Sequence, residues 1–516
     1  MQIAMTGFFT ASRQLPYTTD AAALFDALAT AHDSMLLESA DIESKKNVQC
    51  LAVLDAALKV TCQGQRVHAE VLTATGQAML KRLENQLSEY RVGPGEFEFQ
   101  RPTDKDERRR LKAISNAEVL RKLQLDAGYS HEMLPFLGGG FAYDYLDTFE
   151  ALPQVPNSNN EYPDYEFVVA QTLLHVDHLN HSIVIHGVDI DEDALQARLD
   201  QQLTQAQKLV DAPSTQASST DATATDKTLE EKTVTVTADI VDKDFREHVS
   251  SLQKNIYEGD IYQVVPARSF SMECPDAFAA YRKLRETNPS PYMFYIRGAD
   301  YELIGASPES NLKFDATTRE VQLYPIAGTR PRGATHELDI RNELDMRTDT
   351  KELAEHTMLV DLARNDLARV AVPGTRRVAD LLQVDRYSRV MHLVSRVVAE
   401  LHPDFDAIDA YRACMNMGTL TGAPKLRAME LIRDTEKKRR GSYGGAVGYL
   451  RGDGSMDNCI VIRSAYIKND TAIVQAGAGV VRDSVPQSEA DETLHKAYAV
   501  LHAIAAANNA TLEVIR

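Results

Sequence analysis

Two pairs of glutamates with the same spacing stand far apart in the sequence and could do chemistry together. Glu352 and Glu355 form the first pair, and Glu489 and Glu492 form the second. Both stretches read as helices, on which residues three positions apart project from one face. If the two faces oppose each other, four carboxylates meet. Such a cluster needs a compensating cation, and Mg²⁺ takes oxygen ligands of this kind.

The same spacing also fits simpler interpretations. Asp349 with Glu352, and Ser484 with Gln487, could each form a capping box at the start of a helix. Glutamates on helices are also commonly just solvated. Spacing alone therefore leaves a metal site, helix caps and exposed charge open.

Glycine-rich segments punctuate the second half of the chain. They are P-I-A-G-T-R-P-R-G at 325–333, G-T-L-T-G-A-P-K at 418–425, G-S-Y-G-G-A-V-G-Y at 441–449 and Q-A-G-A-G-V-V at 475–481. Glycines at strand ends let backbone N–H groups approach an anion closely. Arg463 interrupts an apolar strand pattern, where its charge needs a partner such as a substrate carboxylate. Taken singly, each feature also fits a turn or a structural salt bridge.

Composition narrows the class of protein. The 516 residues exceed one typical core, so two or three domains, or two interlocked parts, are expected. A net charge of -19 with no basic stretch argues against nucleic-acid and anionic-membrane partners. The five scattered cysteines form no C-x-x-C pair, which fits reduced thiols in the cytoplasm. Neither a signal peptide nor an apolar stretch long enough for a membrane span is found.

Residues 212–231 are rich in Ser, Thr, Ala and Asp and offer little to bury, so they predict a surface linker. The chain would then divide into an N-terminal domain at 1–211 and a C-terminal domain at 232–516, the alternative being a long loop within one domain. Strands are expected at 51–60, 167–176, 261–270, 292–297, 301–305, 321–326, 443–450, 459–467 and 471–476. Helices are expected at 21–30, 193–210, 245–258, 276–286, 350–363, 404–414, 422–434 and 488–506. This order indicates an α+β sheet architecture, and no nucleotide-binding fingerprint is present.

The glycine segments, together with D-L-A-R-N-D at 361–366, resemble the chorismate-utilising enzymes, and within them the large subunits of anthranilate synthases. The resemblance runs from L-L-E-S at 36–39 to the C-terminal helix. It implies a large antiparallel-sheet sandwich with helices packed outside and an interlocked N-terminal regulatory domain. It also implies an Mg²⁺-dependent enzyme acting on chorismate, a dicarboxylate with a leaving hydroxyl at C4 and an enolpyruvyl ether.

The resemblance assigns binding roles to individual residues. Glu355 and Glu492 match the principal Mg²⁺ ligands, with Glu352 and Glu489 supporting them directly or through water. Residues that match the grip on substrate carboxylates are Gly328, Thr329, Tyr443, Arg463, Gly477, Ala478 and Gly479. Lys496 lies seven residues after Glu489, on the same helical stripe, and either adds charge to the site or is solvated.

Three further residues match catalytic positions. Glu309 corresponds to the general acid that protonates the departing C4 hydroxyl, a role that needs a raised pKa. His392 corresponds to a histidine linked to pyruvate elimination, although a histidine in an apolar stretch is otherwise usually a core residue. Thr419 would line the same pocket.

Two positions discriminate among chorismate enzymes. Relatives that add water to chorismate place a lysine base where this chain has Gln263, so isochorismate or salicylate formation is not expected. Aminodeoxychorismate synthases typically carry a nucleophilic lysine where this chain has Ala327. Both positions favour anthranilate as the product.

A feedback site for L-tryptophan is also implied, by L-L-E-S at 36–39 and N-P-S-P-Y-M at 288–293. The residues that would hold the effector are Glu38, Ser39, Pro291, Tyr292 and Met293. A strand end and a proline-rich turn are the simpler interpretation of these two segments.

The resemblance therefore predicts conversion of chorismate and ammonia to anthranilate and pyruvate through aminodeoxyisochorismate, the first committed step of tryptophan biosynthesis. Because no G-x-C-x-G nucleophile segment is present, ammonia would come from a glutamine amidotransferase (glutaminase) subunit, in a heterotetramer of two large and two small subunits. An aminodeoxychorismate synthase subunit and an inactive tryptophan-sensing homologue are the alternatives.

Overall fold

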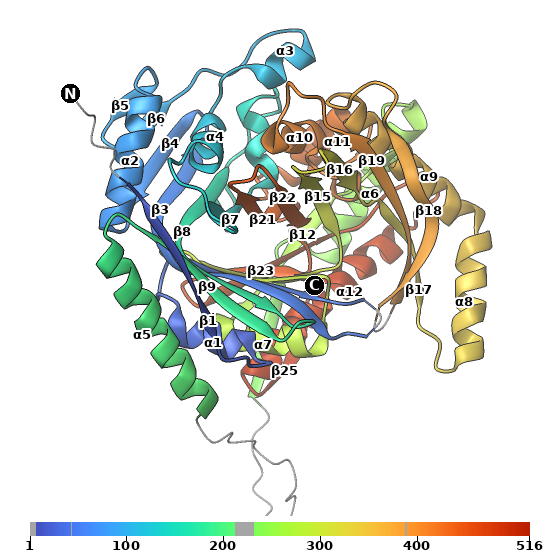
Figure 1. Cartoon of the computed structure of the whole chain (residues 1–516). Helices are drawn as coiled ribbons and strands as arrows, with labels where there is room; N and C mark the ends of the chain where they lie inside the picture. Colours follow the sequence, from blue (N-terminus) through green and yellow to red (C-terminus); the bar gives the residue numbers. More distant parts are fainter. Residues whose placement is uncertain (1–6, 43, 212–231, 388–389) are drawn as a thin grey trace, which may run out of the picture.

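A computed structural model describes residues 7–42, 44–211, 232–387 and 390–516 (Figure 1). The predicted linker at 212–231 lies outside the described residues. Within the described part, none of the helices combines the length and the apolar character that crossing a membrane requires.

The strands form two layers, and the first is antiparallel except for one parallel pair, β10 with β25. Its order is β1 (Phe9–Leu15), β9 (Ser182–Asp189), β8 (Tyr165–Asp177), β3 (Asn47–Gln63), β2 (Ser34–Ala40), β13 (Tyr292–Arg297), β14 (Glu302–Ser307), β23 (Ser464–Lys468), β24 (Thr471–Gly477), β12 (Ala267–Glu273), β10 (Lys232–Ala238) and β25 (Ala510–Ile515). Its outer face is covered by α1 (Ala21–Leu28), α5 (Glu192–Asp211), α7 (Ala277–Thr287) and α12 (Pro486–Ala507).

The second layer starts from the same two long strands, β3 and β8. It continues through β7 (Phe136–Phe141), β21 (Ala446–Arg451), β22 (Met456–Ile460), β15 (Ser310–Asp315), β16 (Glu320–Leu323) and β19 (Val390–Glu400), with β17 (Ile326–Pro331) and β18 (Arg377–Arg386) also on β19. On the other side of β3 lie β4 (Arg66–Val71), β6 (Glu96–Glu98) and β5 (Arg91–Gly93). β11 (Gln263–Val264) and β20 (Gly422–Ala423) form a separate small sheet.

The remaining helices surround this second layer and the open edges. They are α2 (Ala74–Gln86), α3 (Glu107–Lys112), α4 (Glu118–Leu125), α6 (Asp242–Glu258), α8 (His336–Thr348), α9 (Thr350–Ala368), α10 (Ala407–Cys414) and α11 (Lys425–Glu436), with two 3₁₀ turns, η1 (Tyr143–Thr148) and η2 (Gly418–Leu420). One apolar core lies between the layers, and a second lies under the helices that cover the first layer. The predicted α+β sandwich with outer helices is thereby confirmed.

Both halves of the sequence contribute strands to the same layers. β2 pairs with β13, where Leu36 is opposite Tyr295, and β7 pairs with β21, where Gly139 is opposite Gly448. Gly139 is required there because a Cβ atom would lie 2.1 Å from the carbonyl oxygen of Glu166 on the neighbouring strand. The predicted interlocking of the N-terminal part is therefore present, while the division at 212–231 stays a prediction.

Some expected elements differ from the observed ones. The strand expected at 459–467 is two strands, β22 and β23, and Arg463 lies in the turn between them with a left-handed φ of 50°. The apolar run did not reveal this turn because both strands are buried on either side of it. Helix α8 and the hairpin of β18 and β19 were not expected.

Candidate active site

The two glutamate pairs lie on different helices but within electrostatic range of each other. Glu352 and Glu355 lie in α9, and Glu489 and Glu492 lie in α12. Burial raises the pKa of Glu355, and the neighbouring carboxylates of the other three glutamates raise it further, against the lowering effect of Lys351. The two pairs are therefore close enough to interact, as the predicted opposition requires.

The acidic side chains are suitable ligands for a hard cation, although they do not by themselves form a complete coordination shell. Glu489 is 7% exposed, and its Oε2 has no hydrogen-bond partner. Glu352 accepts a hydrogen bond from Arg330 at 2.8 Å, and Glu492 pairs with Lys496 at 2.6 Å. Among the described residues, no three acidic, histidine or cysteine side chains are close enough to hold a metal by themselves. This donor set suits Mg²⁺, which usually keeps several waters and takes further oxygens from a substrate.

Helix capping accounts for the Asp349 carboxylate beside the first glutamate pair, but not for the carboxylates of the glutamates themselves. The Asp349 carboxylate caps α9 by accepting hydrogen bonds from the backbone N–H groups of Lys351 and Glu352 at 2.9 and 3.2 Å. The Glu352 carboxylate contacts Arg330 instead, so the reciprocal bond of a capping box is not seen. Helix α12 starts after Val485, with no side-chain cap.

Glu309 lies between β14 and β15 as a buried acid. Its backbone carbonyl accepts from Ile460 N–H at 3.0 Å, and its carboxyl Oε1 accepts from the Thr419 hydroxyl at 3.0 Å. Burial raises the pKa of Glu309 to about 8, although Thr419, Lys496 and Arg463 act to lower it. The carboxyl group therefore holds its proton at neutral pH, as a general acid requires.

His392 projects from β19 toward a bulge in β17. Its Nδ1 lies 3.3 Å from the Gly328 carbonyl oxygen and 2.9 Å from the Thr329 hydroxyl. The bulge uses Gly328, whose φ of 83° favours glycine. Burial lowers the pKa of His392 to about 4, with the nearby cations Arg463 and Lys496 adding to the effect. A neutral imidazole with its proton on Nδ1, donated to the carbonyl, leaves Nε2 able to accept a proton.

Two cations lie among these groups. Burial lowers the pKa of Arg463, and no hydrogen bond or salt bridge joins its guanidinium to the side chains that the structure describes. Lys496 donates to the Gly477 carbonyl at 3.0 Å, besides its pair with Glu492. A half-buried arginine without an ion-pair partner is costly, so an anionic ligand is the natural partner of Arg463.

The glycine segment at the end of β24 lies against Tyr443. A Cβ atom on Gly477 would lie 3.1 Å from the Tyr443 hydroxyl, and one on Gly479 would lie 3.0 Å from Nε2 of Gln263. Burial raises the pKa of Tyr443 to about 12, so its hydroxyl remains a donor. The Ala478 N–H already donates to the Pro266 carbonyl at 3.1 Å, so that amide is not free for a substrate carboxylate.

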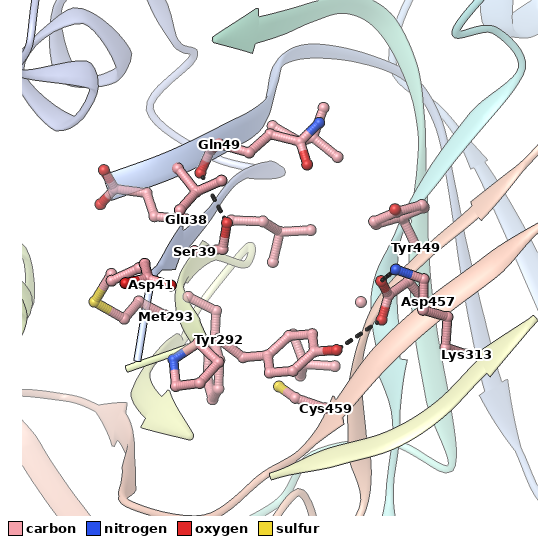
Figure 2. A pocket seen from close by; sticks show the side chains of 18 of the residues that line it. Glu38, Ser39, Asp41, Gln49, Tyr292, Met293, Lys313, Tyr449, Asp457 and Cys459 are labelled. Atoms are coloured by element: carbon pink, nitrogen blue, oxygen red, sulfur yellow. Dashed lines mark hydrogen bonds and ion pairs between the residues drawn. The ribbon is translucent and has the colours of Figure 1, made fainter. Parts of the chain in front are cut away.

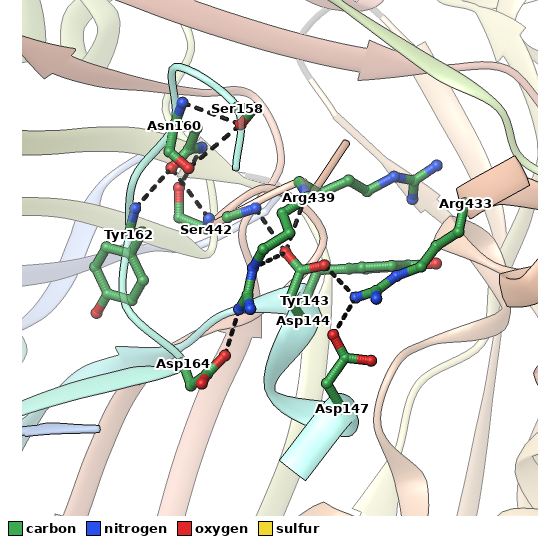
Figure 3. A network of polar contacts seen from close by, with 12 residues as sticks. Tyr143, Asp144, Asp147, Ser158, Asn160, Tyr162, Asp164, Arg433, Arg439 and Ser442 are labelled. Carbon is green, nitrogen blue, oxygen red and sulfur yellow. Dashed lines mark hydrogen bonds and ion pairs between the residues drawn. The ribbon is translucent and has the colours of Figure 1, made fainter. Parts of the chain in front are cut away.

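A buried polar network from the N-terminal half holds the segment that precedes Tyr443 (Figure 3). Asp144 in η1 accepts from the backbone N–H groups of Arg440 and Gly441 at 3.0 and 2.8 Å and from Arg433 at 2.7 Å. Asn160 donates to the Ser442 hydroxyl at 2.9 Å. Sequence reasoning missed this network because its members are about 280 residues or more apart along the chain.

A second missed contact joins two of the motifs. The Lys425 ammonium, at the end of G-T-L-T-G-A-P-K, lies 2.7 Å from the Asp366 carboxylate, at the end of D-L-A-R-N-D. Lys425 also donates to the Cys414 carbonyl at 2.9 Å. Opposite charges at the ends of both motifs were a usable signal for this pairing.

The five residues predicted to hold an effector line one cavity of about 360 Å³ (Figure 2). Its wall also contains Asp457, which accepts from the Tyr292 hydroxyl at 3.1 Å, and Lys313, 3.4 Å from Asp457. The Glu38 carboxylate contacts Tyr281 at 2.6 Å and Arg285 at 3.0 Å, so its charge is already paired. Ser39 donates only a long bond, 3.5 Å, to the Gln49 carbonyl.

The sequence profile of the family described as chorismate binding enzyme matches residues 76–502. The chain belongs to this family. It is 49% identical to anthranilate synthase component 1 of Vibrio cholerae over 513 residues, covering 95% of both chains. It is 48% identical to anthranilate synthase component 1 of Escherichia coli K12 over 517 residues, covering 96% of both. The resemblance drawn from the motifs is confirmed.

Solved structures agree with the family assignment. Anthranilate synthase component I of Streptococcus pneumoniae superposes with a TM-score of 0.69 at 29% identity, covering 88% of this chain and 92% of that one. The menaquinone-specific isochorismate synthase of Escherichia coli superposes with a TM-score of 0.65 at 17% identity, covering 96% of this chain and 95% of that one. The second likeness shows that the chorismate binding fold is shared.

Proposed function

We propose that this chain is the large subunit of an anthranilate synthase, which converts chorismate and ammonia to anthranilate and pyruvate. The observation that carries the proposal is a protonated acid, Glu309, in the same site as a neutral His392 and an unpaired cation, Arg463. The relatives named anthranilate synthase component 1 support the same reaction.

Chorismate binding would use the cations and donors around Arg463. The substrate carries two carboxylates, and a charge-assisted hydrogen bond to a buried guanidinium is strong. Tyr443, in the turn before β21, and Thr329, in β17, supply hydroxyl groups, and Lys496 supplies a second positive charge. The bound carboxylate replaces the missing partner of Arg463 and excludes water from the site.

In the first chemical step, ammonia attacks C2 of the ring while the C4 hydroxyl leaves. The Glu309 carboxyl donates its proton to that hydroxyl, which departs as water, and both ring double bonds shift by one position, from C1=C2 and C5=C6 to C6=C1 and C4=C5. Thr419 holds the carboxyl in place through its hydrogen bond to Oε1. The product of this step is aminodeoxyisochorismate.

In the second step, aminodeoxyisochorismate loses pyruvate and becomes aromatic. The C2 proton leaves, the bond between C3 and the ether oxygen breaks, and the enolpyruvyl group takes up a proton to form pyruvate. The Nε2 atom of His392 is suited to accept the C2 proton because Nδ1–H is held by the Gly328 carbonyl.

Mg²⁺ is proposed as the cofactor, held by Glu355 and Glu492 with Glu352 and Glu489 in support. When bound, the metal would neutralise these carboxylates and hold a substrate carboxylate. The buried, unpartnered Oε2 of Glu489 and the raised pKa of Glu355 support this assignment.

Two residues support anthranilate over related products. Gln263 lies against Gly479, so the position where water-adding relatives carry a lysine borders the site in this chain. Ala327 lies in β17 one residue before the Gly328 bulge, and its side chain offers no nucleophile.

We further propose the partners and regulation implied by the family. Ammonia would come from a glutaminase subunit in a cytoplasmic heterotetramer of two large and two small subunits. L-Tryptophan would bind in the cavity of Ser39, Tyr292 and Met293 and inhibit the enzyme. The placement of all five predicted residues around one cavity supports the effector site.

One assay tests the reaction. The purified chain is incubated with chorismate, Mg²⁺ and ammonium salts, and anthranilate is followed by its fluorescence. We expect anthranilate and pyruvate in equal amounts. A 4-amino product would instead support an aminodeoxychorismate synthase, and no turnover with intact tryptophan binding would support an inactive sensor.

A further inference from the structure

Tyr387, directly after β18 in the hairpin that leads to His392, contacts the His392 ring and the backbone next to Glu309. Its hydroxyl donates to the Pro308 carbonyl at 3.2 Å, directly before Glu309, and its ring meets the His392 ring edge-on at 5.2 Å between centroids. Burial raises the pKa of Tyr387, so the hydroxyl keeps its proton. Arg332 fixes the backbone by donating to the Tyr387 carbonyl at 2.8 Å.

The other face of Tyr387 is covered by a residue from the N-terminal half. The ammonium of Lys45 lies 5.5 Å from the centre of the Tyr387 ring and donates to the Arg386 carbonyl at 3.3 Å. A cation over an aromatic face is an attractive contact that depends on the position of both groups. Figure 1 shows the loop between β2 and β3 reaching toward the ends of β17 to β19.

Lys45 is also hydrogen-bonded to residues that line the predicted effector cavity. Its backbone N–H donates to the Asp41 carbonyl at 3.0 Å, and its ammonium donates to the Ile42 carbonyl. Asp41 and Ile42 both line the cavity that also contains Ser39 and Tyr292. A ligand that moves this wall therefore moves Lys45 relative to the Tyr387 ring.

We propose that Tyr387 is a positioning residue for Glu309 and His392, and that Lys45 couples it to the occupancy of the effector cavity. This inference rests on the proposed function. Tyr387 aligns the carboxyl through the Pro308 carbonyl and the imidazole through its ring. An effector changes the rate by shifting the contact between Lys45 and that ring, without touching the substrate.

Lys45→Met tests the coupling, because methionine keeps much of the side-chain length but removes the positive charge. Calorimetry measures the tryptophan Kd of each protein, and initial rates at saturating chorismate measure how tryptophan changes kcat. Because the proposed coupling acts on the alignment of the catalytic groups and not on chorismate binding, its effect is expected in kcat. We expect Lys45→Met to bind tryptophan within about threefold of wild type, while the tryptophan concentration that halves kcat rises by about tenfold or more.

Lys46→Met is the matched control, since Lys46 is the exposed neighbour in the same loop. It should keep the wild-type coupling. If tryptophan inhibits kcat of Lys45→Met as strongly as that of the wild-type protein, the coupling is overturned. Failure of the proposed function is recognised separately, because the wild-type protein would then form no anthranilate or bind no tryptophan.

Tyr387→Phe tests the positioning role, since it removes the bond to the Pro308 carbonyl and keeps the ring. We expect kcat to fall by about tenfold with the chorismate KM within about twofold, because alignment of the acid and not substrate binding is lost. Tyr257→Phe is the control, because the exposed Tyr257 also donates to a backbone carbonyl, that of Arg482 at 3.2 Å. An unchanged kcat, or a loss confined to KM, would overturn the positioning role.

Discussion

The Thr419 hydroxyl donates a 3.0 Å hydrogen bond to the carboxyl of Glu309, and it does not suffice to keep that carboxyl ionised. Burial outweighs this bond and the nearby positive charges and raises the pKa of Glu309 to about 8. A hydrogen bond from a hydroxyl is thus used to aim the acid and not to stabilise its anion.

The rate should fall at alkaline pH. Glu309 must be protonated to donate to the C4 hydroxyl, so kcat should be level below about pH 8 and decrease above it as the carboxyl ionises. The measurement is anthranilate formation at saturating chorismate and Mg²⁺, with the concentration of free ammonia held constant. A rate that stays level to about pH 9.5 would contradict the assignment of Glu309 as the acid.

Glu309→Gln should separate activity from stability. The amide cannot donate the proton as an acid does, so we expect kcat to fall by about 10²- to 10⁴-fold. A carboxyl whose pKa rises from 4.5 to about 8 on folding makes the folded state less stable as pH increases between those values, because the unfolded state releases its proton first. The midpoint of thermal unfolding of Glu309→Gln, relative to wild type, should therefore increase between about pH 5 and about pH 8. Glu258→Gln, at an exposed position, should show neither change.

Glu355→Gln should reveal the metal through stability as well as activity. Because burial, and then the neighbouring carboxylates, raise the pKa of Glu355, removing its charge should raise the unfolding midpoint in the absence of Mg²⁺. The increase in unfolding midpoint on addition of MgCl₂ should be smaller for Glu355→Gln than for the wild-type protein. Half-maximal activation of the variant should need at least about tenfold more Mg²⁺. Glu247→Gln, exposed on α6, is the control. Equal stabilisation of Glu355→Gln and wild type by MgCl₂ would remove Glu355 from the ligand set.

Ser39→Ala should weaken tryptophan inhibition without lowering kcat. Loss of a hydrogen bond to a charged amino group costs about 1.5–3 kcal/mol, so the half-inhibitory concentration should rise by about 10- to 100-fold. Activity at increasing tryptophan gives the measurement, and Ser44→Ala in the following loop is the control. Wild-type sensitivity in Ser39→Ala would show that its hydroxyl does not bind the effector.

Asp144→Asn should destabilise the protein although it lies outside the active site. The carboxylate accepts from Arg433 and from two backbone N–H groups, and removing one partner of a buried charge pair costs about 3–5 kcal/mol. Urea unfolding followed by tyrosine fluorescence gives the change, and the chorismate KM should rise because Tyr443 follows this segment. Asp147→Asn is the matched comparison, since Asp147 contacts the same Arg433 at 2.5 Å and is more exposed. Equal decreases in the free energy of unfolding of the two variants would contradict the central position of Asp144 in this network.

The sequence was informative wherever a residue type is tied to local geometry. The spacing of Glu352 with Glu355, and of Glu489 with Glu492, indicated one face on each helix, and the structure places each pair in one helix. The family motifs then indicated that Glu309 and His392 belong to the same site. Burial in the folded protein, not the local sequence pattern, keeps Glu309 protonated and His392 unprotonated.

Contacts between distant segments could not be predicted in this way. Asp144 and Arg433 are ordinary charged residues in their local sequence, and only the pairing of β7 with β21 brings their regions together. The turn at Arg463 was hidden because the apolar residues before and after it continue one pattern. Tyr387 gives no local signal either, since its role depends on three segments that meet only in the folded protein.

Because β3 and β8 belong to both layers, the chain cannot be divided into two fragments that each keep all their strand pairs. Neither half of the gene encodes a free-standing folding unit, because β13 and β21 would lose partners that the other half supplies. Truncation would expose unpaired sheet edges, which promote aggregation. Two co-expressed fragments, by contrast, could reassemble a working enzyme, because each would supply the strand partners that the other lacks.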